Sequence, residues 1–316
     1  STEVGKSIQK AAAESNLKRV LLELGGKSPS IIFADSNLDT AVKFTFNGSF
    51  FNHGQCCVAA TRIYVEEHVY DEFLKFKTDA EAIKIGDPFE SKTYQGPQVS
   101  RKQYDRIMSY IKTGKEEGAT LLMGGERHGE RGFYIKPTIF TDVVENMTIM
   151  QDEIFGPVTC IAKFKTIDEV IEKANLTKYG LAAAVFTNNI IKAVKLSKEI
   201  KAGTVWVNQY MEGDSSLPFG GYKQSGIGRE MGKYALREYT QMSFSAFVIQ
   251  RLKNHLEFIK IMVATILTSM DEKIIREIQG QKISGFATQR RISNEIMERN
   301  RKKELHCGHL PKEESY

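Results

Sequence analysis

The sequence has few of the features that define membrane, secreted or unstructured proteins. Its longest apolar stretch, around residues 259–267, is far shorter than the roughly 18 consecutive apolar residues that a membrane span needs. Only 7 of the 316 residues are proline, against 25 glycines, which argues against disorder or low complexity. The first residues have neither the basic start nor the apolar stretch of a signal peptide. We therefore expect a globular chain with no membrane partner.

Cysteine is also scarce, and its placement argues against a disulfide framework. The chain has 4 cysteines, of which Cys56 and Cys57 are adjacent while Cys160 and Cys307 stand apart. No spacing suggests a zinc site, and the cluster His-Cys-Gly-His at 306–309 is a weak candidate, so we expect no metal. Reduced thiols indicate a cytoplasmic protein or one of the mitochondrial matrix. They leave open a reactive cysteine.

Charge of either sign is nearly balanced over most of the chain. Lysine plus arginine number 44 and aspartate plus glutamate 39, which gives a net charge of +5. Residues 251–316 hold 13 basic and 9 acidic residues, a net +4, which leaves +1 for residues 1–250. A nearly neutral main body offers no electrostatic footprint for nucleic acid, so we expect none as a partner.

The pattern of residues 1–250 predicts an α/β fold. Short apolar runs alternate there with longer helical patterns, and no internal repeat interrupts them. After residue 250 the texture changes to an apolar-rich helical pattern at 251–270 and a polar, basic stretch at 271–316. Predicted strands lie at 19–24, 30–34, 62–65, 183–186 and 204–207, with strands and turns over 124–142. Predicted helices lie at 4–13, 39–51, 68–83, 104–117, 167–174 and 190–200.

One segment with chemical potential is Leu-Glu-Leu-Gly-Gly-Lys-Ser-Pro at 22–29. It places Glu23 at the end of an apolar strand, beside two glycines that let another chain or a ligand approach closely. A carboxyl group in such a setting tends toward a raised pKa, which suits a general base near neutral pH. The structural alternative is a strand-end glutamate that is hydrogen-bonded to a neighbouring turn.

The second segment, residues 50–61, contains the paired thiols. Two aromatic residues, a glycine and small residues surround Cys56 and Cys57, as in a narrow apolar tunnel that ends at sulfur. A thiolate is a strong nucleophile once a helix start or a positive charge lowers its pKa. The alternative is a buried structural cysteine, a common state for an unpaired one. His53 lies four residues before Cys57 and is interpreted as structural; the residues alone do not choose between the two cysteines.

Together these segments resemble those of the aldehyde dehydrogenase superfamily. The run Glu-Leu-Gly-Gly-Lys-Ser-Pro matches its glutamate signature, and residues 50–59 match its cysteine signature, which places the nucleophile at Cys57. The resemblance is greatest to the NAD(P)-dependent retinal/acetaldehyde-type group, and Phe-Asn-His-Gly-Gln-Cys-Cys at 51–57 is similar to fungal members. Further matches run colinearly to about residue 250, at 95–97, 153–158, 179–181, 203–208 and 218–226.

The resemblance implies oxidation of a small aldehyde to a carboxylic acid with NAD or NADP. Cys57 would form a thiohemiacetal and then a thioester, and Glu23 would activate the water that hydrolyses it. Glu153 would hold the nicotinamide ribose, with Phe155 near the nicotinamide. The full set implied for the cofactor is Ser1, Leu24, Gly25, Gln103, Arg106, Glu153 and Phe155, and the set implied for the substrate tunnel is Phe51 and Phe219.

Relative to the family, the chain resembles an N-terminally truncated member. We expect a remnant of the dinucleotide-binding domain at 1–25, the catalytic domain at 26–225, a return segment at 226–250 and an extra, partly helical basic tail at 251–316. A homo-oligomer is expected if the missing region is supplied. Two alternatives stay open: an inactive truncated relative that acts as a binding or structural protein, and a thiol esterase that uses Cys57 without a cofactor.

Overall fold

The computed structural model of the chain describes residues 1–248 and 260–265, and the side chains of 1–244. The chain divides into two units, Ser1–Thr240 and Gln241–Tyr316, and each is described by itself. The cluster at 306–309 and most of the basic tail lie outside the described residues. The proposed boundaries after residues 25, 225 and 250 stay predictions.

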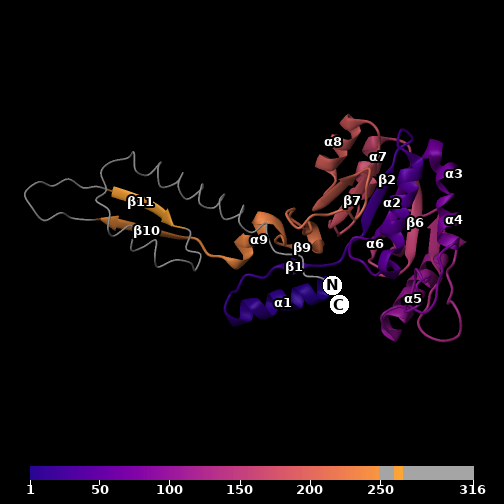
Figure 1. Cartoon of the computed structure of the whole chain (residues 1–316), viewed down its shortest axis with the longest axis horizontal. Coiled ribbons are helices and arrows are strands. Elements are labelled where there is room, and N and C mark those ends of the chain that lie inside the picture. Colours follow the sequence, from indigo (N-terminus) through magenta and orange to yellow (C-terminus); the bar gives the residue numbers. More distant parts are fainter. Residues whose placement is uncertain (249–259, 266–316) are drawn as a thin grey trace, which may run out of the picture. The chain divides into compact units, whose positions relative to one another are not determined.

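A seven-stranded sheet lies at the centre of the first unit (Figure 1). Its order is β4-β5-β6-β3-β2-β7-β8, and all neighbours are parallel except β4 and β5. The α/β class predicted from the alternating pattern is therefore confirmed. The strands are β2 (Ser28–Ile32), β3 (Ala60–Glu66), β4 (Thr120–Met123), β5 (Thr138–Thr141), β6 (Val158–Phe164), β7 (Ala182–Phe186) and β8 (Thr204–Val207).

Helices cover both faces of this sheet. Alternate residues of one strand enter different hydrophobic clusters: Tyr64 packs with one, and Ile63 and Val65 with the other. The cluster of Ile63 includes α2 (Leu38–Phe50), α3 (Tyr70–Phe73) and α4 (Phe76–Glu81). The cluster of Tyr64 includes α5 (Arg101–Glu116), α6 (Thr148–Gln151), α7 (Ile167–Asn175) and α8 (Ile190–Glu199). Burial of strands on both faces explains why they read as continuous apolar runs.

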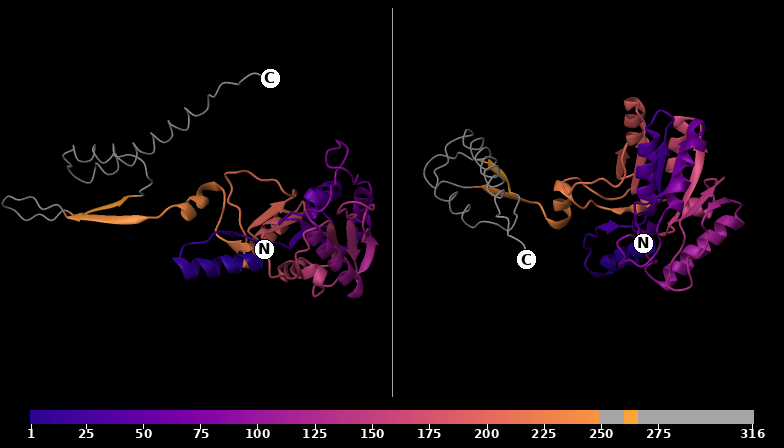
Figure 2. Two further views of the ribbon diagram at one scale, coloured as in Figure 1. Left: turned by 90° about the horizontal axis from the view of Figure 1, so that it is seen from below. Right: turned by 45° about the vertical axis from the view of Figure 1, so that its right-hand side comes forward.

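A second, two-stranded sheet lies outside the first. Strand β1 (Leu22–Glu23) pairs antiparallel with β9 (Gly226–Ile227), so the strand predicted at 19–24 is shorter than expected and is not part of the parallel sheet. Helix α1 (Thr2–Ser15) lies beside this pair (Figures 1 and 2). Gly5 of the helix allows the Leu24 side chain to approach closely, since a Cβ at Gly5 would collide with it. The unit ends with η3 (Lys223–Ser225), β9 and α9 (Gly232–Tyr239).

The long helix predicted at 68–83 is wrong, since the segment is broken into η2 (Glu67–Val69), α3 and α4. Between α3 and α4 the backbone bonds connect residues three apart, as in the bond from the Lys77 N–H to the Leu74 carbonyl oxygen. The apolar side chains are still buried, and the Phe73 and Phe76 rings stack with centroids 5.6 Å apart. The apolar spacing that predicted one helix therefore reflects the burial of these rings, which the shorter helices also achieve.

In the second unit, β10 (Ser243–Val248) pairs antiparallel with β11 (Lys260–Thr265). The helical pattern predicted at 251–270 is thus wrong over Lys260–Thr265. A short apolar run does not distinguish a helix from a strand, and the β-branched Val263 and Thr265 suit a strand that has a partner. Within the described residues, no helix combines the length and the apolar character that crossing a membrane requires.

Candidate active site

The parallel sheet brings three candidate segments to one edge. Glu23, Cys57 and Glu153 precede strands β2, β3 and β6, which are neighbours in the order β6-β3-β2. Because parallel strands all begin at the same edge, the segments that lead into them meet there. This is the amino edge of the sheet, whereas open α/β sheets commonly bind ligands beyond the carboxyl ends of their strands.

A cleft of about 340 Å³ opens at this edge, within the size range of small-molecule sites. Both residues predicted to be catalytic and all seven predicted to contact the cofactor line it, although their roles stay predictions. The nine lining residues are Ser1, Glu23, Leu24, Gly25, Cys57, Gln103, Arg106, Glu153 and Phe155.

The two phenylalanines predicted to line a substrate tunnel are not among those lining residues. Phe51 begins the short helix η1 (Phe51–Gly54) and is 49% exposed, whereas its neighbour Phe50 is fully buried. Phe219 packs against the cluster that includes α2, and its backbone pairs with that of Glu230. Their contact with a substrate stays a prediction.

Two glycines let the thiol and carboxylate segments come together. A Cβ at Gly25 would collide with the Glu153 carboxylate, and a Cβ at Gly26 would collide with the Cys57 carbonyl oxygen. The Gly26 N–H donates to Glu153 Oε1 over 3.1 Å. The glycine pair thus allows two other segments of the same chain to approach closely, which places Glu153 beside the start of β2.

Ser225 holds the glycine segment in place from η3. Its hydroxyl donates to the Gly25 carbonyl oxygen over 2.7 Å and accepts the Gly180 N–H over 2.9 Å. Its own carbonyl oxygen accepts the Leu24 N–H over 2.9 Å. The side chain is fully buried. Sequence reasoning gave Ser225 no role, because a single sequence does not show which distant backbone groups a serine will reach.

Helix α5 shapes the loop that carries Glu153. Ser100 caps the helix, and Gln103 and Arg106 lie three residues apart on one face of it. Gln103 Nε2 donates to the carbonyl oxygens of Ile154 and Phe155 over 3.0 and 2.9 Å. These bonds hold Phe155 at a φ of 61°, an uncommon value for a residue with a side chain. In this structure Gln103 thus supports the loop directly.

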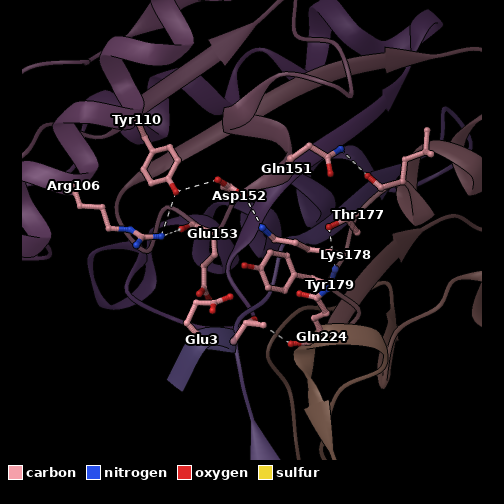
Figure 3. A network of polar contacts seen from close by, with 12 residues as sticks. Glu3, Arg106, Tyr110, Gln151, Asp152, Glu153, Thr177, Lys178, Tyr179 and Gln224 are labelled. Carbon is pink, nitrogen blue, oxygen red and sulfur yellow. Dashed lines mark hydrogen bonds and ion pairs between the residues drawn. The ribbon is translucent and has the colours of Figure 1, made fainter. Parts of the chain in front are cut away.

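A polar network continues from Arg106 (Figure 3). Arg106 donates to the Glu153 carbonyl oxygen over 2.9 Å and contacts the hydroxyl of Tyr110. The Tyr110 hydroxyl in turn lies 3.3 Å from Asp152, whose other carboxylate oxygen accepts a hydrogen bond from Lys178 over 2.8 Å. Asp152, the residue before Glu153, is therefore held in an ion pair, whereas the Glu153 side chain lines the cleft.

Both carboxyl groups of the cleft hold their protons more readily than usual. Burial raises the pKa of Glu153, although the Gly26 N–H opposes this effect. Burial and the nearby charge of Glu230 raise the pKa of Glu23, which otherwise stays largely exposed. This is the direction expected for Glu23 as a general base. Sequence reasoning missed Glu230, whose effect on Glu23 depends on the β1–β9 pairing.

The two adjacent thiols differ in acidity. Their mutual hydrogen bond lowers the pKa of Cys56 to about 7, and the same bond, burial and nearby carboxylates raise the pKa of Cys57. The lower pKa favours Cys56 as the thiolate, whereas access favours Cys57, which lines the cleft with Glu23. A nucleophile must reach its substrate, so the position of Cys57 in the cleft lining suits that role although its pKa is the higher of the two.

Lys27, inside the glutamate segment, is a buried ammonium group that sequence reasoning did not single out. It is 1% exposed, and burial lowers its pKa to about 8. Within the described part of the chain, its Nζ has no hydrogen-bond partner. Together with Arg62 and Lys201, it borders a second cavity. This cavity of about 10 Å³ has room for a single water molecule.

Ser1 closes the cleft at the start of α1. Its hydroxyl caps the helix by accepting the Val4 N–H over 3.4 Å. The N–H groups of a first helical turn favour an anion, and Glu3 is the acidic residue of this turn.

The fold and the cleft define an α/β protein with a cysteine thiol and two carboxyl groups at the amino edge of its sheet. Comparison with known families identifies the family within this class. A family profile described as the aldehyde dehydrogenase family matches residues 1–244, and the chain belongs to that family.

Individual relatives agree with the family profile. An aldehyde dehydrogenase of the fungus Davidiella tassiana is 57% identical over 242 residues, 76% of this chain and 49% of the relative. Mouse retinaldehyde dehydrogenase 3 is 55% identical over 243 residues, 77% of this chain and 48% of the relative. These two agree with the predicted likeness to fungal and retinal-type members.

A solved structure has the same fold. The NAD+ complex of aldehyde dehydrogenase from Bacillus cereus matches with a TM-score of 0.75 and 49% identity, over 76% of this chain and 49% of that chain. The chain therefore spans about half the length of the curated relatives and solved structures that it matches.

Proposed function

We propose that the chain carries the thiol chemistry of NAD(P)-dependent aldehyde oxidation, with Cys57 as the nucleophile. The observation that supports this most directly is that Cys57, Glu23 and Glu153 line one cleft in a member of the aldehyde dehydrogenase family. Cys57, as a thiolate, attacks the aldehyde carbon and forms a C–S bond, while the carbonyl electron pair moves to oxygen. The adduct is a thiohemiacetal on Cys57.

The residues around the cleft fit the nicotinamide end of a dinucleotide. Glu153 supplies a carboxylate for ribose hydroxyl groups, and Gly25 leaves the space beside that carboxylate free of a side chain. Ser1 lies at a helix start, which suits a pyrophosphate. When bound, NAD or NADP supplies the acceptor for the hydride of the thiohemiacetal.

Glu23 completes the proposed sequence by hydrolysis. Once the adduct on Cys57 is oxidised to a thioester, Glu23 takes a proton from water, and the hydroxide oxygen bonds to the acyl carbon. The C–S bond breaks, the carboxylic acid leaves, and the sulfur of Cys57 is restored. The raised pKa of Glu23 brings its basicity closer to neutral pH. Its partial exposure gives water a route to the thioester.

One observation favours a second function. The chain covers 49% of the Davidiella tassiana relative and 49% of the Bacillus cereus structure, so the given sequence holds only part of the residues that make up those proteins. A truncated relative without turnover, acting as a binding or structural protein, is the alternative. A thiol esterase is a third, more remote reading. A homo-oligomer and a cytoplasmic or mitochondrial location also stay predictions.

Reduced-nicotinamide formation tests the proposal directly. The purified chain is incubated with acetaldehyde and NAD or NADP, and absorbance of the reduced cofactor is followed. Cys57→Ala should lower turnover by roughly 10⁴-fold or more, as expected for a lost nucleophile. Cys56→Ala is the matched control, because it removes the neighbouring thiol and should keep turnover. Turnover that survives in Cys57→Ala and is lost in Cys56→Ala would move the nucleophile to Cys56. A folded chain that binds no cofactor would favour the inactive alternative.

A further inference from the structure

The bend that leads into the paired thiols has an unusual backbone. Asn52, His53 and Gly54 follow one another in the left-handed region, with φ values of 49°, 62° and 69°. Residues with side chains rarely adopt this region, and two in succession persist only where the surroundings hold them. The bend connects the end of α2 to Cys56, so its conformation sets where the thiols begin.

Two hydrogen bonds fasten this bend to the neighbouring loop. His53 Nδ1 accepts the Gly96 N–H over 3.2 Å, and Gln55 Oε1 accepts the Val99 N–H over 3.0 Å. Between them, Gly54 packs against the Gly156 carbonyl so closely that a Cβ would collide with it. The bend is thus clamped at three successive residues, on the loop after Gln95 and on the loop that follows Glu153.

The first of these bonds depends on the charge of the imidazole. A backbone N–H can only be accepted by an Nδ1 without a proton, so His53 must be neutral with its proton on Nε2. His53 is half-buried, and burial lowers its pKa below the ordinary value. No charged side chain of the described residues contributes to this shift; the loop facing the ring presents the backbone of Gly96.

We propose that His53 is a positioning residue for Cys57: its neutral imidazole holds the strained bend before the thiols against Gly96. Loss of the bond frees the bend and moves Cys57 out of its half-buried place. The Cys57 thiol then becomes more exposed to reagents, because in the folded chain it is half-buried at the cleft, and its alignment in the cleft is lost. The importance of this role for turnover rests on the proposed function, whereas the position of the thiol does not.

Two substitutions separate the hydrogen bond from the backbone strain. His53→Gly accepts the left-handed φ but removes the acceptor, and His53→Asn accepts it nearly as well and offers Oδ1 in place of Nδ1. The measurement is the rate of iodoacetamide labelling at each cysteine, followed by mass spectrometry of peptides. Cys160, which is fully buried in the sheet, reports unfolding if it labels.

Labelling of Cys57 should be about fivefold faster in His53→Gly, the effect of one lost hydrogen bond, and within about twofold of the native rate in His53→Asn. Equal rates in native protein and His53→Gly would overturn the proposal, and so would an Asn variant as reactive as the Gly variant. If turnover is measurable, His53→Gly should lose it while labelling accelerates. If no variant turns over, the labelling result still decides the role of His53, and the proposed function fails separately.

A second measurement does not depend on the glycine variant. The ratio of Cys57 labelling in native protein to that in His53→Asn cancels the titration of the thiol itself. This ratio should stay constant at neutral pH and rise as the pH falls below the pKa of His53, because protonation breaks the native bond and cannot affect the Asn variant. The titration of His53 is located independently from its imidazole resonance by NMR, and a ratio that stays constant through that titration would overturn the proposal.

Discussion

The polar side chains at the two edges of the seven-stranded sheet differ in how fully they are paired. At the carboxyl edge, Asp35 accepts hydrogen bonds from Thr187 over 2.7 Å and from Lys192 over 3.1 Å. Asn208 exchanges two further bonds with the backbone of Thr187, both of 2.9 Å. At the amino edge, Lys27 has no partner among the described residues, and Glu23, Glu153 and Cys57 all have raised pKa values.

The difference indicates which edge is specialised for chemistry. Paired groups such as Asp35 and Lys192 compensate each other's charge and connect the ends of strands. Groups that are buried without full compensation are kept in a reactive or unusual state at some cost in stability, and such groups cluster at functional sites. The amino edge therefore has the character of a site, even though the usual rule for open α/β sheets would direct attention to the carboxyl edge.

The sharpest test of this comparison exchanges one carboxyl group at each edge for an amide. Glu23→Gln should slow thioester hydrolysis by about 10²- to 10⁴-fold and slow hydride transfer much less, as expected for a lost general base. Asp35→Asn should leave both steps near their native rates. Steady-state turnover compared with the pre-steady-state burst of reduced nicotinamide separates the two steps. An unchanged steady-state rate in Glu23→Gln would remove Glu23 from the mechanism.

Burial of the Lys27 charge at the amino edge should lower the free energy of unfolding, and replacing Lys27 should reveal this loss. Its pKa is about 8 in the folded chain, against roughly 10.4 when unfolded, so burial of its charge costs about 3 kcal/mol below pH about 8. This cost fades as the pH rises from about 8 to about 10.4, where the folded form is already neutral. Lys27→Met should therefore raise the free energy of unfolding most at neutral pH, with a gain that shrinks toward pH about 10.

Urea unfolding at several pH values measures this gain. Lys201→Met is the matched control, because Lys201 borders the same small cavity but is exposed and should show little change with pH. A Lys27→Met chain that is less stable at neutral pH would mean that the ammonium group makes compensating contacts in solution.

The sequence predicted the α/β class and the residues that line the cleft. It predicted less well where each helix and strand begins and ends, and how the cleft residues contact one another. Strands such as 62–65 were clear because burial on both faces makes them continuous apolar runs. The strand predicted at 19–24 is longer than the observed β1, because its apolar residues pack against α1 and β9 and do not join the main sheet. The broken helix at 68–83 and strand β11 were missed, since both depend on tertiary contacts that outweigh local periodicity.

For the site, the family resemblance supplied the nine cleft residues, and local chemistry alone would have supplied two of them. Glu23 and the thiol pair have an unusual local context, whereas Gln103 and Arg106 look like ordinary surface residues of a helix. Two residues of the site were missed. Ser225 bonds to Gly25 from 200 positions further along the chain, and Glu230 raises the pKa of Glu23 from a similar distance in sequence. Such pairings appear only once the chain is folded.

The carboxyl edge should respond to substitution in stability alone. Burial opposes ionisation of Asp35, but hydrogen bonds from Thr187 and Lys192 outweigh it and lower its pKa. Its contribution is thus present above the unfolded pKa and is lost as the pH falls through the lowered folded value. Because the pair is about one-third exposed, Asp35→Asn should cost about 0.5 to 1 kcal/mol at neutral pH, and less in high salt. Thermal unfolding measures this; a loss of turnover would blur the contrast between the edges.

The smallest expected effect is a shift in a pH profile at the amino edge. Glu230 raises the pKa of Glu23, so Glu230→Gln should lower that pKa. Since the ionised form of Glu23 is the base, thioester hydrolysis in this variant should continue to lower pH than in the native chain, with little change at the plateau. Tyr239→Phe is the control, because it removes the 3.0 Å hydrogen bond to Glu230 and leaves the charge. An acid limb that moves equally in both variants would assign the shift to the local structure of the β9–α9 segment rather than to repulsion between two carboxylates.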